Sequence, residues 1–165
     1  MSHRSWANSA ASSPPVPLRN LPPLDAVLIS HDHYDHLDYP TIRALAKRPQ
    51  PFITSLGVGA HLESWGIAPE RITELDWWES TTLTGAAGTE LRVHAAPSQH
   101  FSGRSLTDRN ATLWSSLVIE SPQHRVFFSG DTGLTSEYTA IRDRFGDGAL
   151  RRGRADGNGE EWGRR

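Results

Sequence analysis

Residues 26–38 read AVLISHDHYDHLD, and the interpretation of the whole chain starts from this stretch. It opens with a continuous apolar run, Ala26 to Ile29, of the kind found in a strand covered on both faces. Metal-binding side chains follow directly, at His31, His33, Asp35 and His36. Imidazole and carboxylate groups suit zinc, and also iron or manganese. The stretch therefore predicts a metal site in a turn at the end of a buried strand.

The spacing inside this turn divides the four side chains into two pairs. A tight turn directs His31 and His33 into one coordination sphere, and Asp35 and His36 then face a second sphere beside it. The competing interpretation is a polar loop that is rich in histidine by chance. At this composition the HxHxDH pattern arises by chance about once in a thousand chains, so we favour the metal site.

Apolar periodicity outside the turn predicts alternating strands and helices, and hence an α/β or α+β fold. Helices are expected after Asp38, Ser55 and Thr135, each acting as an N-cap. The expected strands are 26–29, 51–54, 72–77, 90–95, 114–120 and 125–129. Prolines and serines make residues 1–23 an irregular approach segment. Residues 24–146 form the expected domain, and glycine-rich, charged residues 147–165 are expected to be a disordered or frame-shifted tail.

The composition excludes several classes of protein. A chain of 165 residues suits one domain. It has no cysteine, so disulfide scaffolds and thiolate chemistry are excluded. The formal charge of -2 offers no basic excess for a nucleic-acid partner. No apolar run approaches the roughly 20 residues of a spanning helix, and no secretory signal is present, so we expect a cytoplasmic protein, with membrane association left open.

Two further motifs follow the turn in order: PSQH at 97–100 and SGDTG at 129–133. Together with HxHxDH they resemble the metallo-β-lactamase superfamily, whose αββα sandwich holds one or two metals. Three shorter segments resemble one branch of this superfamily: LPPLDAV at 21–27, DWWE at 76–79 and RNATLW at 109–114. That branch contains the N-acylphosphatidylethanolamine-hydrolysing phospholipase D enzymes and their bacterial relatives.

The resemblance implies roles for particular residues. His31, His33 and His100 are expected to hold the first metal. Asp35 and His36 are expected to hold the second, with Asp131 bridging both metals. Zinc is the expected cofactor, with iron or manganese as alternatives. Asp35 and Asp131 are expected to orient the metal-bound hydroxide that attacks the substrate.

The sequence also departs from the family pattern. The family has a further histidine downstream of the bridging aspartate, whereas the last histidine here is His124. The family's first strands and the apolar strand expected after Gly146 are absent from this sequence. We therefore expect a fragment that forms only part of the αββα sandwich. Its second metal is expected to bind more weakly than the first.

Three functions remain open from the sequence. The first is hydrolysis of a phosphodiester, with a phospholipid or a small molecule as substrate and peripheral contact with a membrane. The second is hydrolysis of a lactone, such as a phosphorylated ascorbate lactone, because two metals serve a carbonyl equally well. The third is a non-catalytic truncated remnant. The sequence does not determine the oligomeric state.

Other residues have two interpretations each. Tyr34 lines the expected site, and Arg104 is either the cation nearest a bound phosphate or a solvated loop residue. Asp32 is a possible acceptor for a histidine N–H. The histidines outside the motifs are expected to be structural, although His94 is alternatively a group near the metals: His3, His61, His94 and His124. The tryptophans are expected to pack in the core rather than form a lipid-binding belt: Trp77, Trp78 and Trp114.

Overall fold

The computed structural model describes residues 17–85 and 88–146. Its first sheet is parallel, in the order β1 (Val27–Ile29), β2 (Phe52–Ser55), β3 (Ile72–Leu75). Its second sheet is antiparallel, in the order β4 (Ser80–Thr84), β5 (Glu90–Ala96), β6 (Ser116–Glu120), β7 (Arg125–Phe128). The tail expected at 147–165 and most of the irregular approach segment lie outside the described residues.

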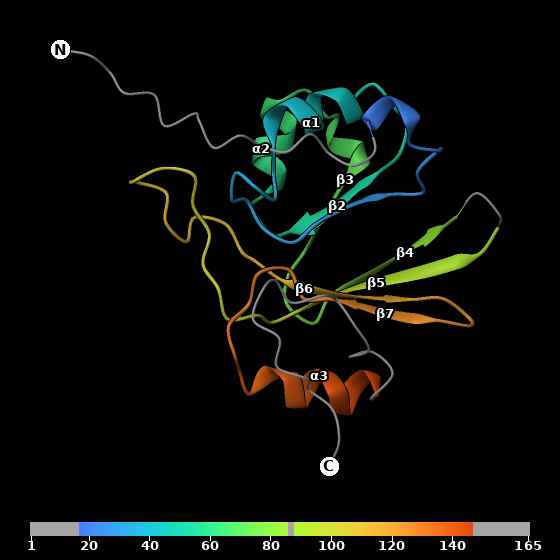
Figure 1. Cartoon of the computed structure of the whole chain (residues 1–165), viewed down its shortest axis with the longest axis vertical. Coiled ribbons are helices and arrows are strands. Elements are labelled where there is room, and N and C mark those ends of the chain that lie inside the picture. The colour runs from blue at the N-terminus through green and yellow to red at the C-terminus, as the bar shows by residue number, and fades with distance from the viewer. Residues whose placement is uncertain (1–16, 86–87, 147–165) are drawn as a thin grey trace.

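The elements form four layers. Helices α1 (Tyr39–Leu45) and α2 (Gly59–Ser64) cover the outer face of the parallel sheet, and α3 (Glu137–Phe145) covers the outer face of the antiparallel sheet (Figure 1). Two single turns of 3-10 helix, η1 (Leu18–Asn20) and η2 (Pro69–Arg71), complete the set of helices in the described part of the chain. This helix–sheet–sheet–helix order confirms the αββα sandwich that the sequence predicts.

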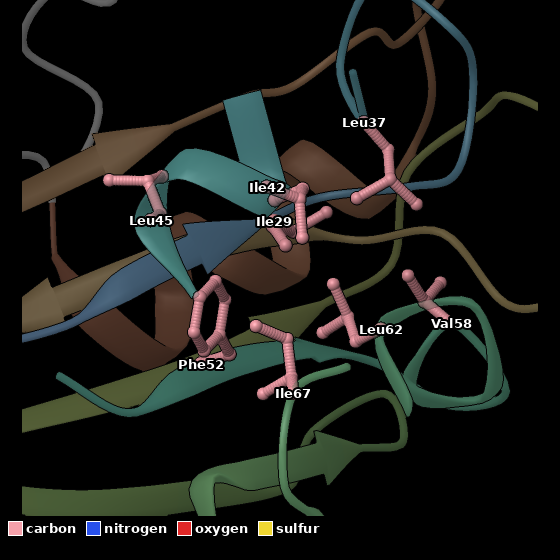
Figure 2. Packing of buried hydrophobic residues seen from close by; sticks show 8 residues of the cluster. All are labelled: Ile29, Leu37, Ile42, Leu45, Phe52, Val58, Leu62 and Ile67. Carbon is pink, nitrogen blue, oxygen red and sulfur yellow. The ribbon is translucent and has the colours of Figure 1, made fainter. Parts of the chain in front are cut away.

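The hydrophobic core under α1 and α2 holds the histidine-rich turn at residues 31–36 in place. Figure 2 shows its eight apolar side chains, which come from β1, β2, the two helices and the connecting loops. Leu37, which directly follows His36, is fully buried in this cluster. A fully buried leucine adds about 1.5–3 kcal/mol relative to an exposed one, so the end of the turn is fixed by packing.

A second cluster fills the space between the sheets, with Ile53 and Leu75 facing Val93, Ala95 and Leu117. Every residue of β2 is buried, because this strand lies between the helices and the antiparallel sheet. β2 is thus buried along its whole length, whereas half-buried β4 alternates between exposed and partly buried positions.

Most of the predicted elements are present, but two of the three predicted N-cap assignments are wrong. The side chain of Asp38 accepts a hydrogen bond from Thr41 N at 2.9 Å, which confirms its role as the N-cap of α1. Ser55 was expected to cap the next helix, but α2 begins four residues later and has no side-chain cap. The Ser55 hydroxyl is buried instead and lies 2.7 Å from Ser30 O and 2.9 Å from Ser115 Oγ.

The structure also shortens several predicted strands and adds another. β3 ends at Leu75, and β6 begins at Ser116. β4 was not predicted, because Ser80–Thr84 has the single apolar residue Leu83 and offers little hydrophobic periodicity. Thr135 lies just before α3, and its hydroxyl accepts a hydrogen bond from Glu137 N, although the N-cap position itself is Ser136.

Three strands end on the same side of the sandwich. The carboxyl ends of β1, β5 and β7 all point to the left in Figure 1, and the loops that follow them lie together there. The turn at 31–36, the segment 97–100 and the segment 129–133 follow these three strands. The topology therefore brings the three motifs of the sequence to one edge of the fold.

Candidate metal centre

The turn after β1 is closed by its own backbone. His36 N and Leu37 N both donate to His33 O, at 3.0 and 2.8 Å. The start of the turn is tied to the second sheet, because Ser115 N donates to Ser30 O at 2.9 Å. The histidines of the turn therefore lie on a backbone that is fixed at both ends.

Three imidazole nitrogens converge beside this turn. His33 Nδ1 lies 3.2 Å from His31 Nε2 and 3.1 Å from His100 Nε2. Two nitrogens bound to one tetrahedral zinc ion at the usual bond length are about 3.4 Å apart. The other ring nitrogen of His33, Nε2, is buried and has no hydrogen-bond partner among the described residues. This set of donors fits one metal ion.

A carboxylate connects this group to a second one. Asp131 Oδ2 lies 3.8 Å from His100 Nε2 and 3.3 Å from His36 Nε2. Asp35 Oδ2 lies 3.7 Å from the same His36 nitrogen. The structure thus brings together all six predicted ligands, in two groups that share Asp131: His31, His33, His100 and Asp131; and Asp35, His36 and Asp131. Their role as metal ligands remains a proposal.

A serine and a glycine support His31 from behind, and the sequence analysis identified neither of them. Ser30 Oγ lies 3.0 Å from His31 Nδ1 and is buried with it. When the Nδ1–H donates to Ser30 Oγ, the lone pair of Nε2 is free for a metal. Gly130 packs directly against this serine, because a Cβ atom at Gly130 would lie 2.9 Å from Ser30 Cβ.

Gly130→Ala is expected to destabilise the fold by about 2–4 kcal/mol. The φ angle at Gly130 is 57°, which disfavours any side chain, and the added methyl group would also press on Ser30. Urea unfolding of the metal-free protein measures the change. In the Ser30→Gly background the penalty should shrink, because the contact with the Ser30 side chain is gone, while the backbone strain and the close approach to Ser115 O remain. An equal penalty in both backgrounds would contradict the proposed contact.

Burial and neighbouring histidines lower the pKa of two imidazoles of the site, those of His31 and His100. Desolvation, together with repulsion by His36, His100 and His33, lowers the pKa of His31 to about 4. Desolvation also lowers the pKa of His100, with His33 as the next cause. These imidazoles are therefore neutral at neutral pH, which is the form that binds a metal.

The metal-free protein should lose stability as the pH falls from about 6.5 to about 4. In this window the unfolded chain protonates His31 and the folded chain does not, so the unfolded state binds more protons and stability rises with pH. Urea unfolding at several pH values measures the slope. His31→Gln should flatten it, whereas the matched change at exposed His124 should not. If His31→Gln left the pH dependence of the stability unchanged, the attribution of that dependence to His31 would be wrong.

The structure places Tyr34 and Arg104 against each other. The guanidinium of Arg104 lies 4.2 Å from the Tyr34 ring centroid, and Tyr34 Oη donates to Arg104 O. Arg104 Nη1 donates to Asp32 O at 2.6 Å and to Leu37 O at 2.8 Å. This arginine therefore holds the backbone of the turn from outside. The predicted substrate-binding role of the two residues remains untested.

Asp32 and three other histidines also have defined positions. Asp32 is buried, and its carboxylate accepts a hydrogen bond from Gly103 N and lies 3.6 Å from His61 Nε2. The histidine nearest to it is thus one from α2 rather than one of the converging three. His94 lies under α3, 2.7 Å from Glu120 and against Phe145. The third, in the β6–β7 turn, is exposed: His124. His3 lies outside the described residues.

Comparison with known proteins shows the family to which this chain belongs. The sequence pattern of the Beta-lactamase superfamily domain matches residues 3–150. The chain belongs to this family. A relative named N-acyl-phosphatidylethanolamine-hydrolyzing phospholipase D 1, from Caenorhabditis elegans, is 34% identical over 139 residues, which are 81% of this chain and 39% of the relative. This likeness supports the branch that the sequence motifs indicate.

One further sequence relative and one solved structure are also similar to this chain. An uncharacterized protein of Mycobacterium tuberculosis is 53% identical over 129 residues, which are 78% of this chain and 33% of that protein. The crystal structure of CmlA, a diiron beta-hydroxylase from Streptomyces venezuelae, aligns with a TM-score of 0.62 and 22% identity, covering 78% of this chain and 25% of CmlA. The chain spans between a third and two fifths of the length of these curated relatives.

None of the described helices is long and apolar enough to cross a membrane. The predicted contact with a membrane surface and the predicted cytoplasmic location both remain open.

Proposed function

We propose that this chain carries the metal-binding part of a metal-dependent hydrolase that acts on a phosphodiester. The observation that supports it most is the carboxylate of Asp131, which lies between the three converging histidines and the Asp35–His36 pair. Such a carboxylate serves two divalent ions at once, and paired ions are typical of enzymes that cleave phosphate esters.

Bound divalent ions would lower the pKa of a water toward neutrality and neutralise charge on phosphoryl oxygens. The residues of the chain orient the metal ligands and the attacking water. Ser30 Oγ is placed to accept a hydrogen bond from Nδ1–H of His31, the tautomer that would leave Nε2 unprotonated for a metal. Asp131 and Asp35 offer carboxylate oxygens that accept a hydrogen bond from a water and so orient it. The side chain of Asp131 is 44% exposed, so a substrate can approach from solvent.

The first substrate to test is an N-acylphosphatidylethanolamine, because of the relative described above. The full chain would be prepared metal-free, reconstituted separately with zinc, iron or manganese, and assayed on this lipid, on a nitrophenyl phosphodiester and on a simple lactone. We expect metal-dependent cleavage of the phosphodiesters. His33→Ala should abolish it, and His124→Ala should preserve it.

Other outcomes of this assay favour the other two functions. Turnover of the lactone alone would replace the phosphodiester with a carbonyl substrate at the same site. A chain without metal binding and without a cooperative unfolding transition would favour the non-catalytic remnant. The assay also shows which of the three metals supports activity, a choice that histidine and aspartate donors leave open.

A further inference from the structure

A groove of about 420 Å³ opens beside the three converging histidines, with His100 as one of its lining residues. Pro97 and Thr135 also line it, and Glu137 contributes a carboxylate from the first turn of α3. Most of the exposed lining is apolar, and three tryptophans are among the residues that form it: Trp77, Trp78 and Trp114. A substrate held at the histidines therefore has an aromatic groove within reach of one of its substituents.

Two of the indoles are fixed by hydrogen bonds to the backbone. Trp77 Nε1 donates to Trp114 O at 2.6 Å, and Trp114 Nε1 donates to Ser98 O at 2.9 Å. Their rings are 6.1 Å apart and inclined at 76°, so they form a corner. Both N–H groups are already used inside the protein, so this corner presents ring surface rather than hydrogen-bond donors to a ligand. Groups of aromatic rings that present their faces in this way recognise quaternary ammonium ligands.

The charges around the corner favour a cation. No lysine or arginine is among the residues that line the groove, and the carboxylate of Glu137 has no ion pair among the described residues. Trp78 shows that a ring here attracts a cation, because the Arg144 guanidinium lies 5.3 Å from its centroid. Within the described chain, no arginine or lysine is placed over the rings of Trp77 or Trp114 in this way. Their corner is thus open to an external cation.

We propose that this groove binds an alkylammonium group carried by one alcohol of the substrate phosphodiester. The corner of Trp77 and Trp114 would surround the charged nitrogen and its methyl or methylene groups, and Glu137 would balance the charge. The link to a phosphodiester rests on the proposed function, whereas the binding of a cation does not. N-acylation removes the charge of an ethanolamine nitrogen, so a free-amine or choline head group should bind better here than an N-acylated one.

Choline and its uncharged carbon isostere, dimethylbutanol, provide the direct test. Each is titrated into the metal-free full chain, and binding is followed by tryptophan fluorescence. We expect choline to bind about 5- to 30-fold more tightly than the isostere, from the cation–π contribution alone. Equal affinity for the two compounds would overturn the proposal, because the groove would then be merely apolar.

A carboxylate variant tests the site without disturbing the core. Glu137→Gln should weaken choline binding about two- to fivefold, as expected for a partly exposed charge pair, and leave the isostere unaffected. Glu63→Gln, on the exposed surface of α2, is the matched control and should change neither. Unchanged choline binding in Glu137→Gln would overturn the assignment of this carboxylate.

The same titration separates this inference from the proposed function. His33→Ala should retain choline binding, because His33 is outside the groove lining. Choline binding in a chain that cleaves no phosphodiester would support the cation site and remove only the proposed function. Phosphodiester cleavage without preference for choline over its isostere would do the reverse.

Discussion

His33→Ala is expected to weaken the tight metal site by more than about 100-fold, because losing a residue that merely supports a ligand already costs 10- to 100-fold. His33 Nδ1 lies within 3.2 Å of both other histidine nitrogens of the first group, so it is central to that donor set. The measurement is calorimetric titration of the metal-free chain with zinc.

His124→Ala is the matched control for this experiment, because His124 is exposed in the β6–β7 turn. It should bind zinc as the unmodified chain does. The assignment of the first group would be wrong if His33→Ala bound zinc with unchanged affinity. Far-ultraviolet circular dichroism of both variants establishes that any loss comes from the site rather than from the fold.

Asp131→Asn is expected to remove the weaker of two metal sites and to loosen the tighter one by about 10- to 100-fold. The amide keeps the shape of the side chain but loses the negative charge that both groups share. The second group has one histidine, and the side chain of Asp35 is 78% exposed, so without the charge of Asp131 it has little affinity left. We expect the unmodified chain to bind one ion tightly and a second weakly.

The same titration, extended to a second equivalent of zinc, measures both sites. Asp143→Asn is the control, because its carboxylate is exposed on α3 and contacts Arg142. Two equally tight sites in the unmodified chain would mean that a residue outside the proposed groups completes the second sphere. A variant that retains both sites would remove the bridging role from Asp131.

Much of the candidate site follows from local sequence. His31, His33, Asp35 and His36 lie within one turn, so their spacing alone predicts which of them can face the same ion. The cap at Asp38 and the buried strand before the turn are local in the same way, because each depends on residues a few positions apart. His100 and Asp131 were placed by resemblance to a family rather than by any periodicity.

Other features have no local signal. Arg104 is an ordinary loop residue in the sequence, yet in the structure it holds the turn through the carbonyls of Asp32 and Leu37, about seventy positions away. Ser55 has the sequence features of a helix cap, but its hydroxyl instead contacts the carbonyl of Ser30 after β1 and the hydroxyl of Ser115 just before β6. Such contacts join residues that are distant in the chain, and a hydroxyl or guanidinium accepts many partners, so its sequence context does not select one.

The sequence by itself determined the order of the helices and of every strand except β4, and the set of potential metal ligands in the turn, because both depend on residues that are near neighbours in the chain. Only the tertiary structure decided that Asp131 lies between the two groups, that Gly130 leaves room for Ser30 behind His31, and that two indoles form a corner beside His100. Each of these requires strands from different sheets to end at the same edge of the sandwich. That arrangement follows from burying apolar faces between four layers, which is a property of the whole fold rather than of any one segment.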